Sequence, residues 1–361
     1  MKKRLIVFWM IMALVIAMAH PIGAADKIYV SGYEKLFVID GTRDVLTKEI
    51  PVKGILREMH YSPDSKHLYA THERRELVAV VDTDRDVVVK DLSFAYPEPG
   101  SVSRVLGLAV SNDNKKLFTH TLNYRVFPTK GMVEMLPWTV NITDVATGKV
   151  EARIPVPKGD GNAIYPLADS RYIYLLGRDI WKVDVVDKKV VDMIPMQSDP
   201  VQAKDALWLW WQYRRKGGVI IEPYYASNPG ISGGSRDVMG LAWIDPSGKL
   251  TLKETGPPIF YFAGVMSSDR KRAYAIYNEL TMFEIEDKEG TEVVRVSHRV
   301  LPTPEHPFPG SYYSVDLSSD DKKVYGSAAG PDVMVMDAHT GKILKIIDLP
   351  TETWHMVVVP K

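Results

Sequence analysis

The chain has 361 residues, of which 45 are Lys or Arg, 45 are Asp or Glu and none is Cys. The formal net charge of +0 argues against the basic stripe that nucleic acids require and the polybasic tract that anionic lipids attract. The absence of cysteine excludes disulfides, cysteine–metal sites, a cysteine nucleophile and the covalent attachment of a c-type haem.

The first 25 residues have the pattern of a secretory signal peptide. Basic residues at 2–4 precede an apolar run over 5–19, and small residues at 23–25 offer a cleavage site. The run of about 15 residues is shorter than the roughly 20 of a membrane-spanning helix, and an uncleaved anchor is the alternative interpretation. We therefore expect residues 1–25 to be removed and residues 26–361 to be exported to the periplasm.

One motif recurs along the rest of the chain: an apolar strand that ends in an acidic residue, followed by a polar turn and a second strand. The seven terminal acids are Asp40, Asp82, Asp144, Asp184, Asp245, Glu286 and Asp337. A carboxylate at this place can accept hydrogen bonds from the backbone of its own turn, which explains why a turn follows it directly. Repetition of this kind predicts a radial all-β architecture.

A second motif alternates with the first and sets the length of the repeat. It consists of an apolar strand, a Ser/Asp turn and a strand rich in Tyr, with turn acids at Asp64, Asp113, Asp169, Asp269 and Asp320. The gap of 100 residues between Asp169 and Asp269 holds two units, one of them with a degenerate turn at 213–218. The average unit is then about 51 residues, the length of a four-stranded propeller blade.

The two ends of this region complement each other. Residues 27–40 lack the first strand of a unit, whereas residues 354–360 form a first strand with no second. Aligning Pro360 with Pro63 places the C-terminal strand in the N-terminal blade. We predict a single all-β domain over residues 26–361, a seven-bladed β-propeller of four-stranded blades that the C-terminal strand closes.

Residues beside the central channel are the first group of site candidates. Arg57, Glu58 and His355 are predicted at the start of innermost strands, where the strands converge. A Glu58–His355 pair could bind an ion there, although a pair that only holds waters is the simpler interpretation. The sequence has no GxSxG, HExxH or Walker motif, so we predict no catalytic residue and no metal site in this chain.

Large aromatic residues near one rim are the second group of candidates. They are Trp208, Trp211, Tyr261, Phe262, Tyr312 and Tyr313. Amphipathic rings of this kind are typical of ligand walls and partner interfaces, but packing between blades explains them as well. Two long insertions, at 127–138 and 222–237, are expected to project from the ring, where functional loops usually occur.

Four stretches give the chain a resemblance to a known family. They lie at 173–190, 207–212, 259–280 and 311–326, and include the tryptophan-rich run LWLWWQ. Through these stretches and the order in which they occur, the chain resembles the β subunit of quinohaemoprotein amine dehydrogenase. The resemblance spans essentially the whole expected mature chain.

The resemblance implies a periplasmic heterotrimer that oxidises primary amines. In that family a dihaem cytochrome c α subunit transfers electrons, and a small γ subunit carries a cysteine tryptophylquinone together with the catalytic base. The β propeller binds no cofactor itself, packs against the γ subunit and helps to wall the substrate cavity. The family's catalytic residues have no counterparts in this chain, which agrees with its lack of cysteine.

Two other classes of function stay open on the sequence alone. One is a stand-alone secreted β-propeller that acts as a binding module. The other is a self-sufficient propeller enzyme, such as a lactonase or a dehydrogenase that uses a soluble quinone or a metal. An enzyme of this second class should gather His, Asp or Arg residues at the axial mouth, and only Arg57, Glu58 and His355 qualify.

Overall fold

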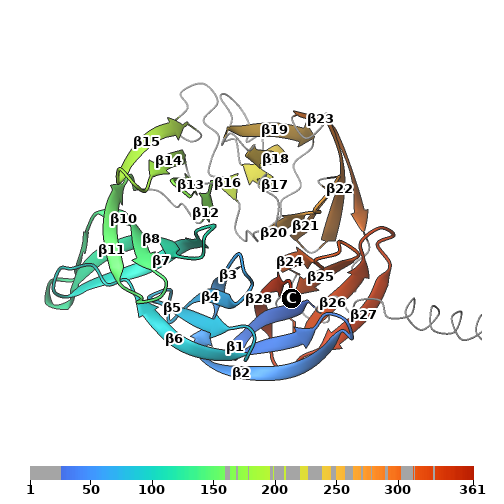
Figure 1. Cartoon of the computed structure of the whole chain (residues 1–361), viewed down its shortest axis with the longest axis horizontal. Helices are drawn as coiled ribbons and strands as arrows, with labels where there is room; N and C mark the ends of the chain where they lie inside the picture. Colours follow the sequence, from blue (N-terminus) through green and yellow to red (C-terminus); the bar gives the residue numbers. More distant parts are fainter. Residues whose placement is uncertain are drawn as a thin grey trace, which may run out of the picture.

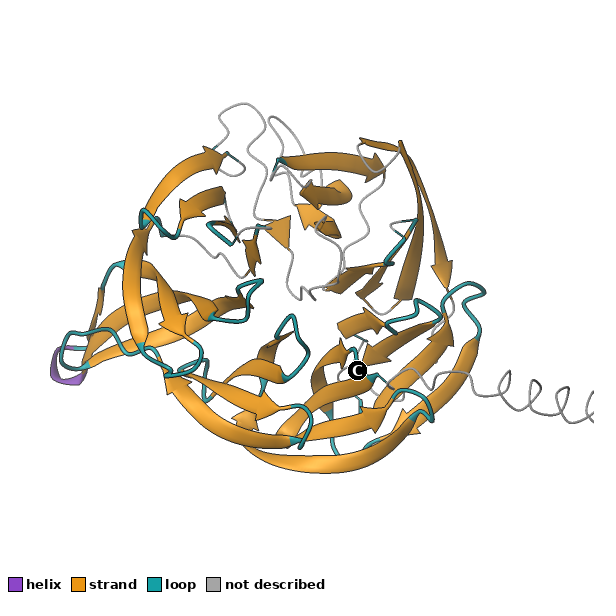
Figure 2. Cartoon of the chain, in the orientation of Figure 1, coloured by secondary structure: helices purple, strands orange, loops and turns teal. Residues whose placement is uncertain are grey.

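The computed structural model is an all-β protein. It describes residues 26–158, 163–167, 170–177, 179–195, 198, 207–208, 220–226, 238–244, 249–256, 263–269, 271–277, 279–288, 292–301, 312, 314–327 and 330–361. These residues are mostly strand, with one 3-10 turn at Pro128–Lys130 (Figure 2). Within the same ranges, no helix has the length and apolar character needed to cross a membrane.

The strands of the described residues form seven antiparallel sheets, numbered here along the chain. Sheet 1 has the order β2 (Val45–Ile55), β1 (Lys27–Asp40), β28 (Thr353–Val359). Sheet 2 has β3 (Arg57–Tyr61), β4 (His67–His72), β5 (Leu77–Asp82), β6 (Val87–Ser93). Sheet 3 has β7 (Ser101–Val110), β8 (Lys116–Phe127), β10 (Trp138–Asp144), β11 (Val150–Val156), with β9 (Met132–Met135) beside β8.

The remaining four sheets each have four strands in chain order. Sheet 4 has β12 (Ala163–Pro166), β13 (Tyr172–Leu176), β14 (Ile180–Asp184), β15 (Lys189–Ile194). Sheet 5 has β16 (Leu207–Trp208), β17 (Ile220–Ala226), β18 (Val238–Ile244), β19 (Leu250–Gly256). Sheet 6 has β20 (Ala263–Met266), β21 (Arg272–Tyr277), β22 (Glu279–Lys288), β23 (Glu292–Leu301). Sheet 7 has β24 (Ser314–Leu317), β25 (Lys323–Ser327), β26 (Asp332–Asp337), β27 (Ile343–Asp348).

The sheets stand around a common centre, as in a β-propeller (Figure 1). Strands β3, β12, β24 and β28 lie towards the middle of the ring, and β2, β6, β15 and β27 lie along its rim (Figure 1). Apolar side chains fill the space between neighbouring sheets. One buried cluster, for example, joins Val38 of sheet 1 to Leu68 of sheet 2, and Tyr274 of sheet 6 to Met334 of sheet 7. The predicted all-β propeller fold is confirmed.

The C-terminal strand completes the N-terminal sheet. In β28, Val359 pairs with Lys27 and Met356 pairs with Val30, both antiparallel. Strand β1 bends at Glu34, which has a positive φ of 55°, so that its second half pairs with β2 instead. This is the pairing that the sequence predicts between residues 354–359 and 27–30.

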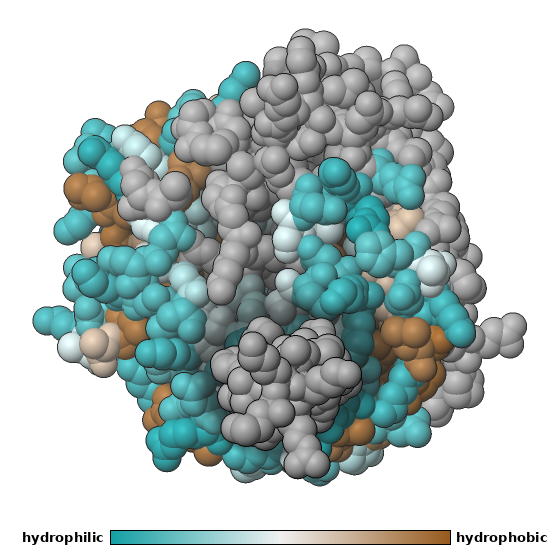
Figure 3. Space-filling view, turned by 45° about the vertical axis from the view of Figure 1, so that its right-hand side comes forward, coloured by the Kyte–Doolittle hydropathy of each residue, from teal (hydrophilic) through white to brown (hydrophobic). Residues whose placement is uncertain are grey.

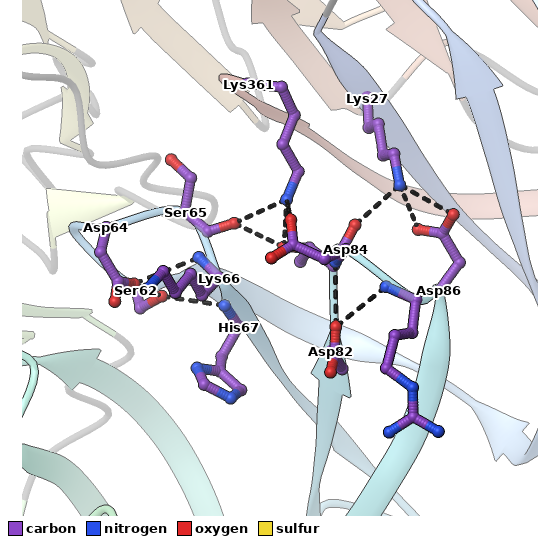
Figure 4. A network of polar contacts seen from close by, with 12 residues as sticks. Lys27, Ser62, Asp64, Ser65, Lys66, His67, Asp82, Asp84, Asp86 and Lys361 are labelled. Carbon is purple, nitrogen blue, oxygen red and sulfur yellow. Dashed lines mark hydrogen bonds and ion pairs between the residues drawn. The ribbon is translucent and has the colours of Figure 1, made fainter. Parts of the chain in front are cut away.

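Two lysines, Lys27 of β1 and Lys361 just after β28, are also held by one turn of sheet 2 (Figure 4). Lys27 Nζ donates to the Thr83 carbonyl at 2.7 Å and lies 2.8 Å from Asp86 Oδ2. Lys361 Nζ donates to Asp84 Oδ1 and to Thr83 Oγ1, each at 2.6 Å. The turn between β5 and β6 therefore ties β1 and the residue just after β28 to sheet 2.

The recurrent acids shape their turns through backbone hydrogen bonds. Asp82 Oδ1 accepts the N–H groups of Asp84 and Arg85 at 3.0 and 2.9 Å. Asp337 Oδ1 accepts those of His339 and Thr340 at 3.1 and 2.7 Å. Because the same contact recurs in sheets far apart in the sequence, the motif is explained by local turn chemistry.

These turns should make stability depend on acidic pH. The backbone N–H of Arg85 lowers the pKa of Asp82, and that of Thr340 lowers the pKa of Asp337. A carboxylate whose pKa is lower in the folded state stabilises the fold above its unfolded pKa of about 3.9. That contribution is lost as the pH falls through the folded pKa.

We therefore expect Asp82→Ala and Asp337→Ala to lower the free energy of unfolding at neutral pH. At a pH below both the folded and the unfolded pKa of the aspartate, the same substitutions should lower it much less. Urea unfolding at several pH values measures this, with Glu352→Gln, an exposed residue outside these turns, as the control. An equal loss at every pH would show that the carboxylate charge has no part in the effect.

Candidate functional site

The axial candidates lie where the innermost strands of sheets 1 and 2 meet. Arg57 and Glu58 open β3, and His355 lies in the adjacent β28. The residues that contact or surround them form what we call the axial cluster: Arg57, Glu58, Thr71, Arg75, Trp354 and His355. Arg57 is opposite Thr71 in the pairing of β3 with β4, so the cluster is built on regular strands.

Glu58 is the buried centre of this cluster, with only 3% of its surface exposed. Arg75 donates to both of its oxygens, from Nη2 to Oε1 at 2.5 Å and from Nε to Oε2 at 3.2 Å. The Thr71 hydroxyl donates to Oε2 as well. Burial raises the pKa of Glu58, and the charge of Arg75 and the hydrogen bond from Thr71 act in the opposite direction.

Arg75 was not among the residues that the sequence indicated. It lies in the turn between β4 and β5, where Glu73, Arg74 and Arg75 all have positive φ. The backbone of the turn is anchored to the next sheet, because Val105 N donates to the Arg75 carbonyl at 2.7 Å. A carboxylate predicted on a buried inner strand requires a cation, and the nearby run ERRE was the signal that could have identified one.

Arg57 and His355 give the cluster a positive character. The Arg57 guanidinium lies 5.8 Å from the centre of the Trp354 ring, a cation–π contact. Burial, followed by the charges of Arg57 and Arg75, lowers the pKa of His355 well below its usual value. His355 is therefore neutral at neutral pH, and two arginines against one glutamate leave one positive charge.

This arrangement suits the binding of an anion better than that of a cation. The predicted Glu58–His355 ion site would have to hold a cation beside two arginines. Across the part of the chain that the structure describes, no group of three or more His, Asp or Glu residues could hold a metal ion. The cluster carries positive charge, and its one carboxylate is already hydrogen-bonded by Arg75 and Thr71.

The aromatic candidates can be placed only in part. Tyr312 has 2% of its surface exposed and belongs to the apolar core, so its position agrees with the packing alternative. Burial, and then the charge of Asp332, raises its pKa. Trp208 lies in β16 opposite Tyr225, with its side chain outside the described part. Trp211, Tyr261, Phe262 and Tyr313 lie outside the described residues, and the cavity wall stays a prediction.

The first insertion forms an exposed hairpin at the edge of sheet 3. It contains the end of β8, the Pro128–Lys130 turn and β9, and Met132, Val133 and Met135 are exposed there. Of the second insertion, only 222–226 in β17 is described. On the face of the molecule seen in Figure 3, apolar residues of the described part occur in small groups among hydrophilic ones.

Comparison with models of known protein families and with the sequences of curated proteins gives no match. Among solved structures, a protein of unknown function from Desulfotomaculum acetoxidans is 11% identical, with a TM-score of 0.62 and coverage of 93% of this chain and 99% of that one. Hydrazine synthase from Kuenenia stuttgartiensis is 13% identical, with a TM-score of 0.55 and coverage of 88% and 90%. The β-propeller domain of Cps50 (Swd1) from Myceliophteria thermophila is 11% identical, with a TM-score of 0.55 and coverage of 82% and 87%. At these identities the similarity shows the β-propeller fold alone.

Proposed function

We propose that this chain is the cofactor-free β subunit of a periplasmic quinohaemoprotein amine dehydrogenase. The sequence resemblance supplies the family. The observation that carries the subunit role is the axial cluster, in which Glu58 is already paired with Arg75 while Arg57 rests on Trp354. The cluster offers charge for recognition, and no nucleophile activated by a neighbouring base occurs in it.

The same proposal includes the finer architecture, a ring of seven blades closed by the C-terminal strand. Its support is the number of sheets in the described residues and the pairing of β28 with β1. In such a ring the blades keep only short, protected edges, and a rigid ring is a suitable base for loops and for a partner subunit.

In this assignment the reaction is the oxidation of a primary amine, and its redox groups belong to the partners. The cysteine tryptophylquinone of the γ subunit would take up the electrons of the amine, and the two haems of the α subunit would carry them away. The propeller would exclude water and hold the γ subunit in place, with Trp208, Trp211, Tyr261, Phe262 and Tyr313 as candidates for the wall of the cavity.

Purification of the tagged chain from its native host tests the proposal. We expect it to bring down a dihaem protein and a small quinone-bearing polypeptide, and the complex to reduce a dye when a primary amine is added. The isolated mature chain should show no haem absorbance and no amine oxidation. Recovery of the chain alone from the host would favour the stand-alone binding module, and turnover by the isolated chain would favour a self-sufficient enzyme.

A further inference from the structure

A cavity of about 250 Å³ lies between sheets 1 and 2, at a different place from the axial cluster. Its apolar wall includes Val52 of β2, Ala79 of β5 and Val88 of β6. Its polar lining consists of Lys53, His72 and Asp91. All of these belong to the regular strands of the two sheets, and none belongs to a turn.

The cavity lies beside a position of the repeat that varies in size: β5 and β18 have alanine there, Ala79 and Ala242, and two other strands have a large side chain. Ala79 stands three residues before the turn acid of its strand, and Phe37 in β1 and Met334 in β26 occupy the equivalent place. Both of those side chains are fully buried. In sheet 7, the Met334 methyl covers Gly326, where an added Cβ would lie 3.1 Å from it. Sheet 2 has Ala70 opposite Ala79 instead, and the space that a larger side chain would fill stays open.

A histidine holds the carboxylate of this cavity in place. His72 Nε2 lies 3.0 Å from Asp91 Oδ1, and because a carboxylate can only accept, Nε2 carries the hydrogen. Within the described residues, no hydrogen bond reaches the other oxygen, Asp91 Oδ2, and the Asp91 side chain is 35% exposed. The second ring nitrogen, His72 Nδ1, is buried, so this ring cannot act as a base on a molecule in the cavity.

The lining therefore has three features: the Asp91 carboxylate, one oxygen of which accepts no hydrogen bond from the described residues, the exposed ammonium group of Lys53, and an apolar wall. Lys53 forms no ion pair with any residue of the described part, and its side chain is exposed on β2. A simple cation would meet the charge of Lys53, and a simple anion would meet that of Asp91. A ligand with both charges and an aliphatic body satisfies all three features.

We propose that this cavity binds a small aliphatic amino acid as its zwitterion. The ammonium group of the ligand donates to Asp91 Oδ2, its carboxylate accepts from Lys53, and its side chain lies against Val52, Ala79 and Val88. His72 is a positioning residue that fixes the carboxylate of Asp91. At about 30 Å³ for each water, the cavity has room for about eight waters, which suits a molecule of the size of leucine. The site is independent of the proposed subunit role.

Titration of the full chain with L-leucine tests the proposal, followed by calorimetry or by ligand-observed NMR. We expect leucine to bind at least about tenfold more tightly than 3-methylbutylamine or 4-methylpentanoate, which each lack one of the two charges. Asp91→Asn and Lys53→Gln should each weaken leucine binding by about tenfold or more. Asp348→Asn, which removes an exposed carboxylate from the outer strand of sheet 7, is the control and should leave binding unchanged.

The sharpest variant is Ala79→Met, which introduces the residue that sheet 7 has at this position. It should abolish leucine binding and leave the melting temperature equal or higher, because the methionine fills the cavity. If Ala79→Met lowers the melting temperature strongly, the exposed Lys53→Gln variant still decides the question. Leucine that fails to bind at millimolar concentration, or that binds Ala79→Met as well as the wild type, would overturn the proposal. Binding of 3-methylbutylamine as tight as that of leucine would also overturn the proposal, because it would indicate a site for cations.

Discussion

Deletion of residues 354–361 is expected to leave a chain that does not hold its native fold at room temperature. The deleted segment contains four fully or almost fully buried residues, Met356 and Val358 in the cluster shared with the last sheet and Val357 and Val359 in the cluster that includes sheet 2. Burial of such a side chain contributes about 1.5–3 kcal/mol, so the four together contribute roughly 6–12 kcal/mol. A whole domain is stable by only about 5–15 kcal/mol.

The deletion also removes hydrogen bonds and exposes an edge. Without β28, the backbone of Lys27 to Val30 loses its pairing partner, and sheet 1 presents a free edge on which another chain can add a strand. The ties of Lys361 to Asp84 and Thr83 are lost as well. We therefore expect aggregation together with the loss of native circular dichroism.

The measurement is thermal and urea unfolding of the truncated chain beside the chain of residues 26–361. Glu352→Ala, an exposed residue just before β28, is the control and should change little. A synthetic peptide of residues 352–361 added in trans should restore folding, because an isolated strand can complete a sheet from outside. A truncated protein that melts at the temperature of the full chain would refute the role of β28 in closing the fold.

The sequence predicts those parts of the fold that depend on local chemistry. Asp82 and Asp337 are recognisable because the carboxylate and the N–H groups that it accepts are only two or three residues apart. The pairing of β28 with β1 is predictable for another reason: a repeat that lacks one strand at its start and has an extra one at its end can be completed only by joining the two.

The features that the sequence does not indicate depend on contacts between distant elements. The bond between Glu58 and Arg75 requires a turn with three successive positive φ values, which no residue preference in ERRE predicts. The cavity beside Ala79 becomes visible only when sheet 1 is packed against sheet 2. Tyr312 is ambiguous because tyrosine suits both a buried packing position and the wall of a binding site.

Glu58→Ala is expected to lower the free energy of unfolding by about 3 kcal/mol. The variant leaves Arg75 without its carboxylate in a site that is largely closed to water, and a buried pair that loses one member typically costs about 3–5 kcal/mol. The lower figure applies here because the Arg75 side chain is 25% exposed and can recover some hydration. Thr71, which is fully buried, loses its acceptor as well.

Replacement of both partners separates the cost of an unpaired charge from the net value of the pair. In Glu58→Met/Arg75→Met, two unbranched apolar side chains replace the two charges, so we expect the double variant to be more stable than Glu58→Ala. Arg74→Ala, exposed in the same turn and also at positive φ, is the control for disturbance of the backbone. Urea unfolding of the wild type, Glu58→Ala, Glu58→Met/Arg75→Met and Arg74→Ala measures the effect. If Glu58→Ala costs no more than Arg74→Ala, then Glu58 is not the buried centre of an ion-paired cluster, and no axial site is built around it.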